Sequence, residues 1–139
     1  MTWPVAVDSS VLVAILLEES DAEAFLEVLI DSEPMISLAT RVELGCVARR
    51  KLGPTGIEEA EGLLSDLGIV SVPLDEQQAE IALAAMDRYG KGRGAEPAIL
   101  NYGDLFSYTL AKARDLPLFY KGGDFARTDV RSALAELGG

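Results

Sequence analysis

The stretch that decides the fold is PVAVDSSVLVAIL, residues 4–16. Its first four residues form a short apolar run that is typical of a buried strand. Asp8 follows directly, and Ser9 and Ser10 can cap a helix that runs through residues 11–18. A strand that passes straight into a helix is the opening unit of a parallel α/β sheet. We therefore expect Asp8 at the carboxyl end of a strand, where such sheets form their sites.

The same alternation of strand and helix continues along the chain. Three more short apolar runs predict strands at residues 35–38, 69–72 and 118–120. Helical spacing predicts helices at residues 21–31, 41–52, 57–67, 76–89, 104–114 and 130–137. Thr40 and Glu43 have the spacing of a capping box at the start of one of them. The predicted fold class is α/β, a three-layer α/β/α sandwich in one domain, residues 1–139, with a central parallel sheet of four to five strands.

Four acidic residues stand at predicted strand ends or helix starts: Asp8, Glu43, Asp104 and Asp124. The chain contains no histidine, which excludes a histidine-dependent acid–base mechanism. Two like charges about 4 Å apart repel by roughly 4 kcal/mol at an effective dielectric of 20, so four carboxylates in one pocket need protons or cations. Mg²⁺ and Mn²⁺ prefer carboxylate oxygen. If the four acids converge, metal-assisted chemistry on phosphate is the natural interpretation.

Each acid also has a purely local interpretation. Asp8 can be a helix cap, and Glu43 the capping-box partner of Thr40. Asp104 can be a favourable charge in the first turn of a helix, and Asp124, after two glycines, a turn residue. The spacing of these residues in the sequence leaves open whether they meet in space.

Charge is unevenly distributed along the chain. The net charge is −11, from 23 acidic and 12 basic residues. The bases concentrate in residues 41–51, 88–93 and 112–131, which are the segments around three of the four acids. We therefore expect a local basic rim around an acidic centre, with an acidic surface on the opposite side. The alternative is that these bases lie on ordinary solvated helix faces.

Cysteine content and hydropathy limit the compartment. The single cysteine, Cys46, excludes an internal disulfide and a cysteine-based zinc site. Its helical position predicts buried packing. The apolar run at residues 11–17 is too short to span a bilayer, so no membrane association is expected. The cytoplasm is the expected compartment.

Four segments of the chain resemble a known family. They are VDSSVLVAIL at residues 7–16, TRVELGCV at 40–47, YGKGR…LNYGDLFSYTLAK at 89–112 and PLFYKGGDFARTDV at 117–130. In this order, and over essentially the whole chain, they resemble a PIN-domain ribonuclease of the VapC type, the toxin of bacterial toxin–antitoxin pairs. The last two segments are the most specific.

The resemblance implies roles for particular residues. Asp8, Asp104 and Asp124 resemble the family's metal-binding aspartates, and Glu43 resembles the acid that completes the catalytic set. Supporting positions are implied for Ser9, Ser10 and Asp129. Contacts to RNA phosphates are expected from Lys91, Arg93 and Lys121.

The implied function is a Mg²⁺-dependent endoribonuclease, with Mn²⁺ as an alternative cation. It would cut tRNA or rRNA to inhibit translation and leave a 5′-phosphate and a 3′-hydroxyl. The implied partners are a cognate VapB-type antitoxin, the RNA substrate and a second copy of the toxin in a homodimer, with toxin and antitoxin together forming a hetero-oligomer.

Two other classes of function are compatible with the residues. One is a catalytically silent binding module that keeps the fold and its partner. The other is a phosphoacceptor receiver domain, in which Lys121 would follow the last strand. In that case strand one should end in a pair of acids, and Asp75 is a poor candidate acceptor.

Overall fold

A computed structural model describes residues 2–90 and 100–137 of the chain. Within them a four-stranded sheet has the order β3-β2-β1-β4. All three strand pairings are parallel. The strands are β1 (Trp3–Val7), β2 (Ser32–Ser37), β3 (Val70–Val72) and β4 (Leu118–Phe119). The helices are α1 (Ser9–Leu16), α2 (Ala22–Ile30), α3 (Leu38–Leu52), α4 (Gly56–Asp66), α5 (Glu76–Tyr89), α6 (Tyr102–Arg114) and α7 (Ala133–Leu137). The predicted α/β class is confirmed.

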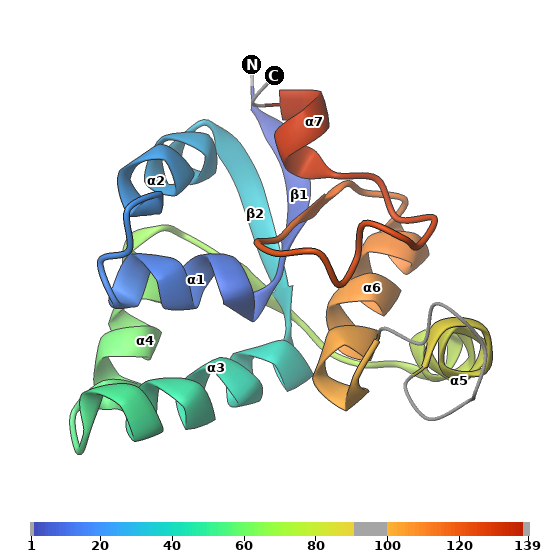
Figure 1. Ribbon diagram of the computed structural model, residues 1–139, viewed down its shortest axis with the longest axis horizontal. Helices are drawn as coiled ribbons and strands as arrows, with labels where there is room; N and C mark the ends of the chain where they lie inside the picture. Colours follow the sequence, from blue (N-terminus) through green and yellow to red (C-terminus); the bar gives the residue numbers. More distant parts are fainter. Residues whose placement is uncertain (1, 91–99, 138–139) are drawn as a thin grey trace.

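Helices cover both faces of the sheet (Figure 1). The side chains of β1 alternate between these faces, as the pleat of a strand requires. Val5 and Val7 pack with α1, α2, α3 and α4, whereas Ala6 packs with α5 and α6. Phe119 of β4 lies in the first of these cores, where its ring meets that of Phe25 edge to face at 5.2 Å. The sheet is therefore the middle one of three layers and is buried on both sides, which explains why its strands are short apolar runs.

Strand β1 lies at the point where the order of the strands along the chain reverses. From β1 the chain moves outward to β2 and then β3, and it returns to the other side of β1 as β4. In open parallel sheets the crevice at such a reversal, outside the carboxyl ends of the strands, is where ligands bind. Asp8 follows β1 at this position, and the segment after β4 carries Asp124.

The predicted start of α3 is wrong. Helix α3 begins at Leu38, three residues before the predicted start, because β2 ends at Ser37 and the Ser37 hydroxyl caps the helix by accepting a hydrogen bond from the Ala39 N–H at 3.2 Å. Thr40 is consequently a buried residue inside the helix, 1% exposed, and forms no capping box with Glu43. Serine is as good a cap as threonine, and the apolar residues after it hid the boundary.

Cys46 also differs from its predicted environment. It is exposed on α3 rather than buried. Leu38 and Val42, at four-residue spacing before it, are exposed too, so an apolar stripe of this helix faces outward. No helix among the residues described is long and apolar enough to cross a membrane.

Candidate active site

Asp8 is held at the junction of β1 and α1. It is itself the N-cap of α1, and its Oδ2 accepts a hydrogen bond from the Ser10 N–H at 3.1 Å. Its Oδ1 accepts a second hydrogen bond from the Ser107 hydroxyl of α6. Asp8 is only 4% exposed. A buried carboxylate with both oxygens hydrogen-bonded has a fixed orientation, so the capping role and a role in a site are compatible.

Asp104 is fixed by the start of α6. Asn101 is the N-cap, and its Oδ1 accepts from the Asp104 N–H at 2.9 Å. In return, Asp104 Oδ2 accepts from the Asn101 N–H at 3.0 Å, which completes a capping box. The cap occupies one carboxylate oxygen of Asp104 with a backbone donor and orients the other.

Glu43 reaches the same region from the second turn of α3. Its Oε1 accepts a hydrogen bond from the Ser9 hydroxyl at 3.0 Å. Its Oε2 lies against α6, because a Cβ atom added to Gly103 would stand 1.9 Å from it. A side chain at position 103 would displace the Glu43 carboxylate from this place, so the glycine before Asp104 is part of how the acids are brought together.

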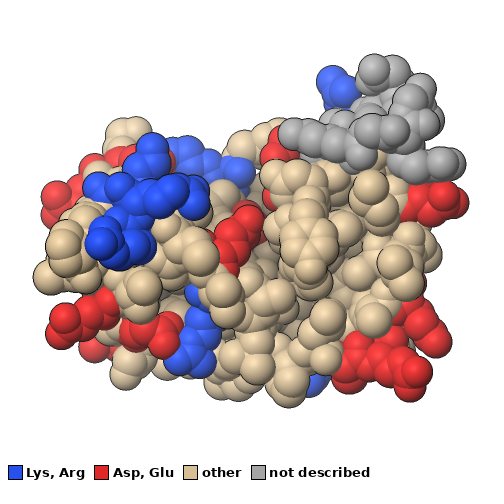
Figure 2. All heavy atoms as spheres, turned by 90° about the horizontal axis from the view of Figure 1, so that it is seen from below, with Lys and Arg blue, Asp and Glu red and all other residues tan. Residues whose placement is uncertain are grey.

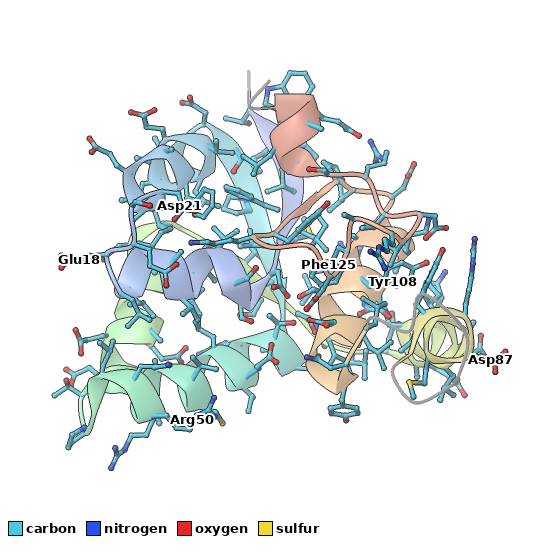
Figure 3. The ribbon with its side chains drawn as sticks, viewed as in Figure 1. Glu18, Asp21, Arg50, Asp87, Tyr108 and Phe125 are labelled. Atoms are coloured by element: carbon cyan, nitrogen blue, oxygen red, sulfur yellow. The ribbon has the colours of Figure 1, made fainter. Side chains whose placement is uncertain are left out.

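Asp124 lies on the segment that follows β4. We expected Asp124 at the end of a strand, but β4 ends at Phe119 and a turn with Gly122 at φ +97° intervenes. The segment is attached to the start of α1 by a hydrogen bond from the Lys121 N–H to the Ser10 hydroxyl at 2.9 Å. Phe125, 2% exposed, anchors it to the core. Figure 3 shows Phe125 and Tyr108 where this segment passes α6, and both belong to the same hydrophobic cluster.

The four carboxylates act on one another electrostatically. The pKa of Asp104 is raised from 3.8 to about 6, first by burial and then by the charges of Asp8, Asp124 and Glu43. Burial also raises the pKa of Glu43, against the hydrogen bond from Ser9. The structure therefore brings the four acids, from distant segments of the sequence, near enough for the charges of the others to act on Asp104. Their catalytic and metal-binding roles remain predictions.

The basic rim is narrower than expected. Figure 2, which looks at the face carrying α3, shows acidic side chains in a hollow at its centre and a dense group of Lys and Arg to one side. Arg49, Arg50 and Lys51 form the basic last turn of α3. The charge of Arg50 acts on Glu43. Two of the bases after residue 111 are engaged in ion pairs, Lys112 with Asp129 at 3.1 Å and Arg131 with Glu136 at 2.9 Å.

The three residues expected to contact RNA have different outcomes. Lys91 and Arg93 lie outside the described residues. Lys121 is engaged elsewhere, since its Nζ pairs with Glu19 at 2.6 Å and with Asp21 at 3.0 Å. Asp21 is labelled in Figure 3 at the start of α2. A contact of Lys121 with RNA would have to compete with both of these ion pairs.

Asp129 is placed in a different cluster. It accepts a hydrogen bond from the Tyr108 hydroxyl at 2.5 Å and forms ion pairs with Lys112 at 3.1 Å and Arg88 at 3.8 Å. Burial alone would raise the pKa of Asp129, but the Tyr108 and Lys112 hydrogen bonds and the nearby positive charges hold it below its ordinary value. Its contacts tie the segment after β4 to α5 and α6, so any support it gives to the site is indirect.

Sequence reasoning missed two buried hydroxyls. Ser107, 1% exposed, donates to Asp8, and its oxygen lies 3.3 Å from that of Thr40. Ser107 follows Asp104 by three residues on a predicted helix, so the two share a helix face. That spacing was the available signal.

The donor set of the site suits a hard divalent cation. Asp8, Asp104 and Asp124 offer only carboxylate oxygen, the ligand chemistry that Mg²⁺, Mn²⁺ and Ca²⁺ prefer. The groups whose charges raise the pKa of Asp104 are the three other acids, which is the repulsion that a bound cation relieves. In the described part of the chain, no group of three or more Asp, Glu or Cys side chains is arranged so that it could hold a metal ion as it stands.

Comparisons with known proteins agree with this geometry. A family model described as PIN domain matches residues 5–131. Ribonuclease VapC28 of Mycobacterium tuberculosis is 39% identical over 129 residues, which cover 92% of this chain and 96% of the relative. The chain therefore belongs to the PIN-domain family, and within it to the VapC ribonucleases. The family implies dependence on a divalent metal in general.

Solved structures with low sequence identity share the fold. The crystal structure of VapC20 from Mycobacterium tuberculosis, described as a Sarcin-Ricin loop cleaving toxin, has a TM-score of 0.72 at 14% identity and covers 91% of this chain and 95% of its own. VapBC2 from Rickettsia felis, bound to a DNA fragment from its promoter, has a TM-score of 0.69 at 16% identity and covers 93% of this chain and 96% of its own.

Membership of the PIN-domain family makes the receiver-domain alternative wrong. Asp75 instead caps α5, where its side chain accepts a hydrogen bond from the Gln78 N–H.

Proposed function

We propose that this chain is a Mg²⁺-dependent endoribonuclease, the toxin of a toxin–antitoxin pair, and that Asp8, Glu43, Asp104 and Asp124 are its catalytic residues. The observation that carries the proposal is the convergence of these four carboxylates, in which burial and then the charges of the three other acids raise the pKa of Asp104 to about 6. Ionised acids that lie close together without a compensating base destabilise the folded state, which argues against a purely structural role for them. In a PIN-domain chain they are the residues that can hold a divalent cation.

In this proposal Asp8, Asp104 and Asp124 hold the cation. A divalent ion there would neutralise charge on phosphate oxygens and make a water molecule more acidic. The chain's own residues orient the ligands: the α6 capping box fixes Asp104, and the Ser9 hydroxyl fixes Glu43. Glu43, with its raised pKa, is suited to receive a proton near the reacting phosphate. Cleavage should leave a 5′-phosphate and a 3′-hydroxyl, because no histidine is available for the cyclic-phosphate route.

The substrate and partners follow from the relatives. One solved neighbour is described as a Sarcin-Ricin loop cleaving toxin, which supports structured RNA as the substrate and tRNA or rRNA as targets. Another is a VapBC pair, which supports a cognate VapB-type antitoxin. A toxin homodimer within a toxin–antitoxin hetero-oligomer, a single PIN domain over residues 1–139 and action in the cytoplasm complete the proposal.

The basic last turn of α3 is the surface we propose for the RNA backbone. Arg49, Arg50 and Lys51 are all exposed, at the end of the helix whose second turn carries Glu43. Their position lets them attract phosphates toward an otherwise acidic protein, because local charge rather than net charge governs such contacts. The unmatched acids alone would repel RNA, so the cation and this turn act together.

The test is cleavage of end-labelled tRNA, rRNA and a sarcin–ricin loop oligonucleotide by the purified protein. Reactions contain Mg²⁺ or EDTA, and Asp8→Asn is purified in parallel. Discrete cuts that disappear with EDTA and in Asp8→Asn are expected. Equal cutting by both proteins would identify a contaminating nuclease. Absence of cutting and of metal binding by the wild type would favour the catalytically silent binding module.

A further inference from the structure

Three polar residues form a hydrogen-bonded chain that ends on the Asp8 carboxylate. The Ser107 hydroxyl of α6 contacts Asp8 Oδ1 on one side and the Thr40 hydroxyl of α3, at 3.3 Å, on the other. Thr40 and Ser107 are each 1% exposed, and Asp8 is 4% exposed. The chain therefore links α3, α6 and the start of α1 within the protein interior.

The direction of the hydrogen bonds is fixed by the carboxylate at its end. An ionised carboxylate can only accept, so Ser107 must use its single proton to donate to Asp8. The oxygen of Ser107 is then the acceptor for Thr40, which must donate. With Thr40 in place, the Ser107 hydroxyl cannot rotate its proton away from Asp8 without losing a second bond. Two residues thus hold one lone pair of Asp8 in a defined direction.

The second oxygen of Asp8 is constrained from another side. Its Oδ2 accepts from the Ser10 N–H at 3.1 Å, as part of the α1 cap. With one donor on each oxygen, the plane of the carboxylate is set, and the remaining lone pairs point in fixed directions. Ligand carboxylates that are oriented in this way bind metal more tightly, because less reorganisation accompanies binding.

We propose that Ser107, supported by Thr40, is a positioning residue that sets the affinity of the site for a divalent cation by orienting Asp8. The inference rests on the proposed function, since it concerns the same site. Neither residue touches the reacting atoms, and both act through Asp8. Mutation of a residue that hydrogen-bonds to a metal ligand typically lowers metal affinity by roughly 10- to 100-fold.

The structure offers a matched control on the same helix. Thr109 is 0% exposed, and its hydroxyl oxygen has no hydrogen-bond partner among the described residues. Thr109→Val removes a buried hydroxyl with little change of shape, as Thr40→Val does. The control separates loss of any buried hydroxyl from loss of the one that orients Asp8.

The experiment is calorimetric titration of Mn²⁺ into the full-length protein at pH 7.5, with thermal unfolding in EDTA as a separate record of stability. Ser107→Ala should weaken Mn²⁺ binding by roughly 10- to 100-fold, and Thr40→Val by less. Thr109→Val should bind as the wild type does. Ser107→Thr, which keeps the hydroxyl, should restore binding relative to Ser107→Ala.

A double-mutant cycle tests the order of the chain. Because Thr40 acts through Ser107, Thr40→Val should cause no further loss of Mn²⁺ affinity in the Ser107→Ala background. If Ser107→Ala does not fold, Thr40→Val against Thr109→Val carries the same comparison.

Two failures can be distinguished. If the wild type, Ser107→Ala and Thr40→Val all bind Mn²⁺ with the same affinity, the positioning role is overturned and the proposed function is left intact. Wild type that binds no Mn²⁺ at all would contradict the proposed function and, with it, the positioning role.

Discussion

Two polar clusters meet α6: one holds four acids, and the other surrounds the single acid Asp129 with a tyrosine and two basic side chains. At the start of the helix, burial and then the charges of Asp8, Asp124 and Glu43 raise the pKa of Asp104 to about 6. One to two turns later, Asp129 lies against Tyr108 and Lys112 with Arg88 nearby, and its pKa is lowered. The ionised carboxylate of Asp129 is stabilised by its neighbours. The ionised carboxylates of the four-acid cluster instead repel one another. In the proposed function, the first cluster binds the cation, whereas the contacts of Asp129 hold the fold together.

The largest expected difference between the clusters is in RNA cleavage. Asp104→Asn should lower the cleavage rate by roughly a thousandfold or more, because it removes a ligand and a charge from the cation site. Asp129→Asn should stay within roughly tenfold of the wild type, since Asp129 acts only through the segment after β4. Single-turnover cleavage of one end-labelled RNA measures both. Equal losses in the two variants would remove the distinction.

Gly103 gives a way to disturb the four-acid cluster without changing any acid. Gly103→Ala should displace the Glu43 carboxylate, because the new Cβ would stand 1.9 Å from Glu43 Oε2. We expect roughly a 10- to 100-fold loss of cleavage, while stability changes little, since alanine favours the helix. Chemical denaturation and cleavage assays on the same preparation measure the two effects.

Gly62 of α4 provides the control for that substitution. A Cβ added to Gly62 meets nothing within 4 Å. Gly62→Ala should raise stability by about 0.5–1 kcal/mol and leave cleavage unchanged. Unchanged cleavage in Gly103→Ala as well would mean that Glu43 is free to relocate.

Stability without metal should change in opposite directions in the two clusters. In EDTA at pH 7.5, Asp104→Asn should stabilise the protein by about 1 kcal/mol, because it removes repulsion while an amide oxygen can keep the capping bond to Asn101. Asp129→Asn should destabilise it by about 1 kcal/mol, a figure that allows for the partial exposure of its ion pairs. Each change corresponds to a shift in Tm of roughly 3–5 °C. Destabilisation by both variants would contradict the electrostatic comparison.

The raised pKa of Asp104 also predicts how pH affects stability. Between about pH 4 and 6 the folded protein takes up a proton that the unfolded chain does not, because the pKa is about 6 when folded and 3.8 ordinarily. The contribution of Asp104 should therefore make the metal-free protein more stable as the pH falls through 6. Mg²⁺ should raise Tm at pH 8 and have little effect at pH 5. A thermal shift by Mg²⁺ of equal size at both pH values would exclude Asp104 from the site.

Much of the architecture could be predicted from the sequence, because strands buried on both faces leave short apolar runs and helices leave periodic ones. The position of Asp8 after β1 followed from PVAVDSS alone. The start of α3 was misjudged because Ser37 and Thr40 are both good caps, and only the end of β2 decides between them. The exposure of Cys46 depends on which face of α3 the sheet and α4 leave open.

The candidate site was less accessible to sequence reasoning than the fold. That four acids converge depends on the sheet order, which brings the ends of β1 and β4 together. Asp129 lies two residues from Arg127 and two from Arg131 in the sequence, and nothing there indicated that it would contact Tyr108 and Lys112 of α6 instead. Ser107 was missed because a buried serine in a helix has no distinctive pattern, although its spacing from Asp104 placed it on the same face.

The most direct measurement is the anomalous scattering of Mn²⁺ in crystals of the protein grown at pH 7.5. The account predicts a peak bound by the carboxylates of Asp8, Asp104 and Asp124, and none at Asp129. A peak confined to other acidic side chains, or no peak at millimolar Mn²⁺, would contradict the claim that the four unmatched carboxylates form a cation site.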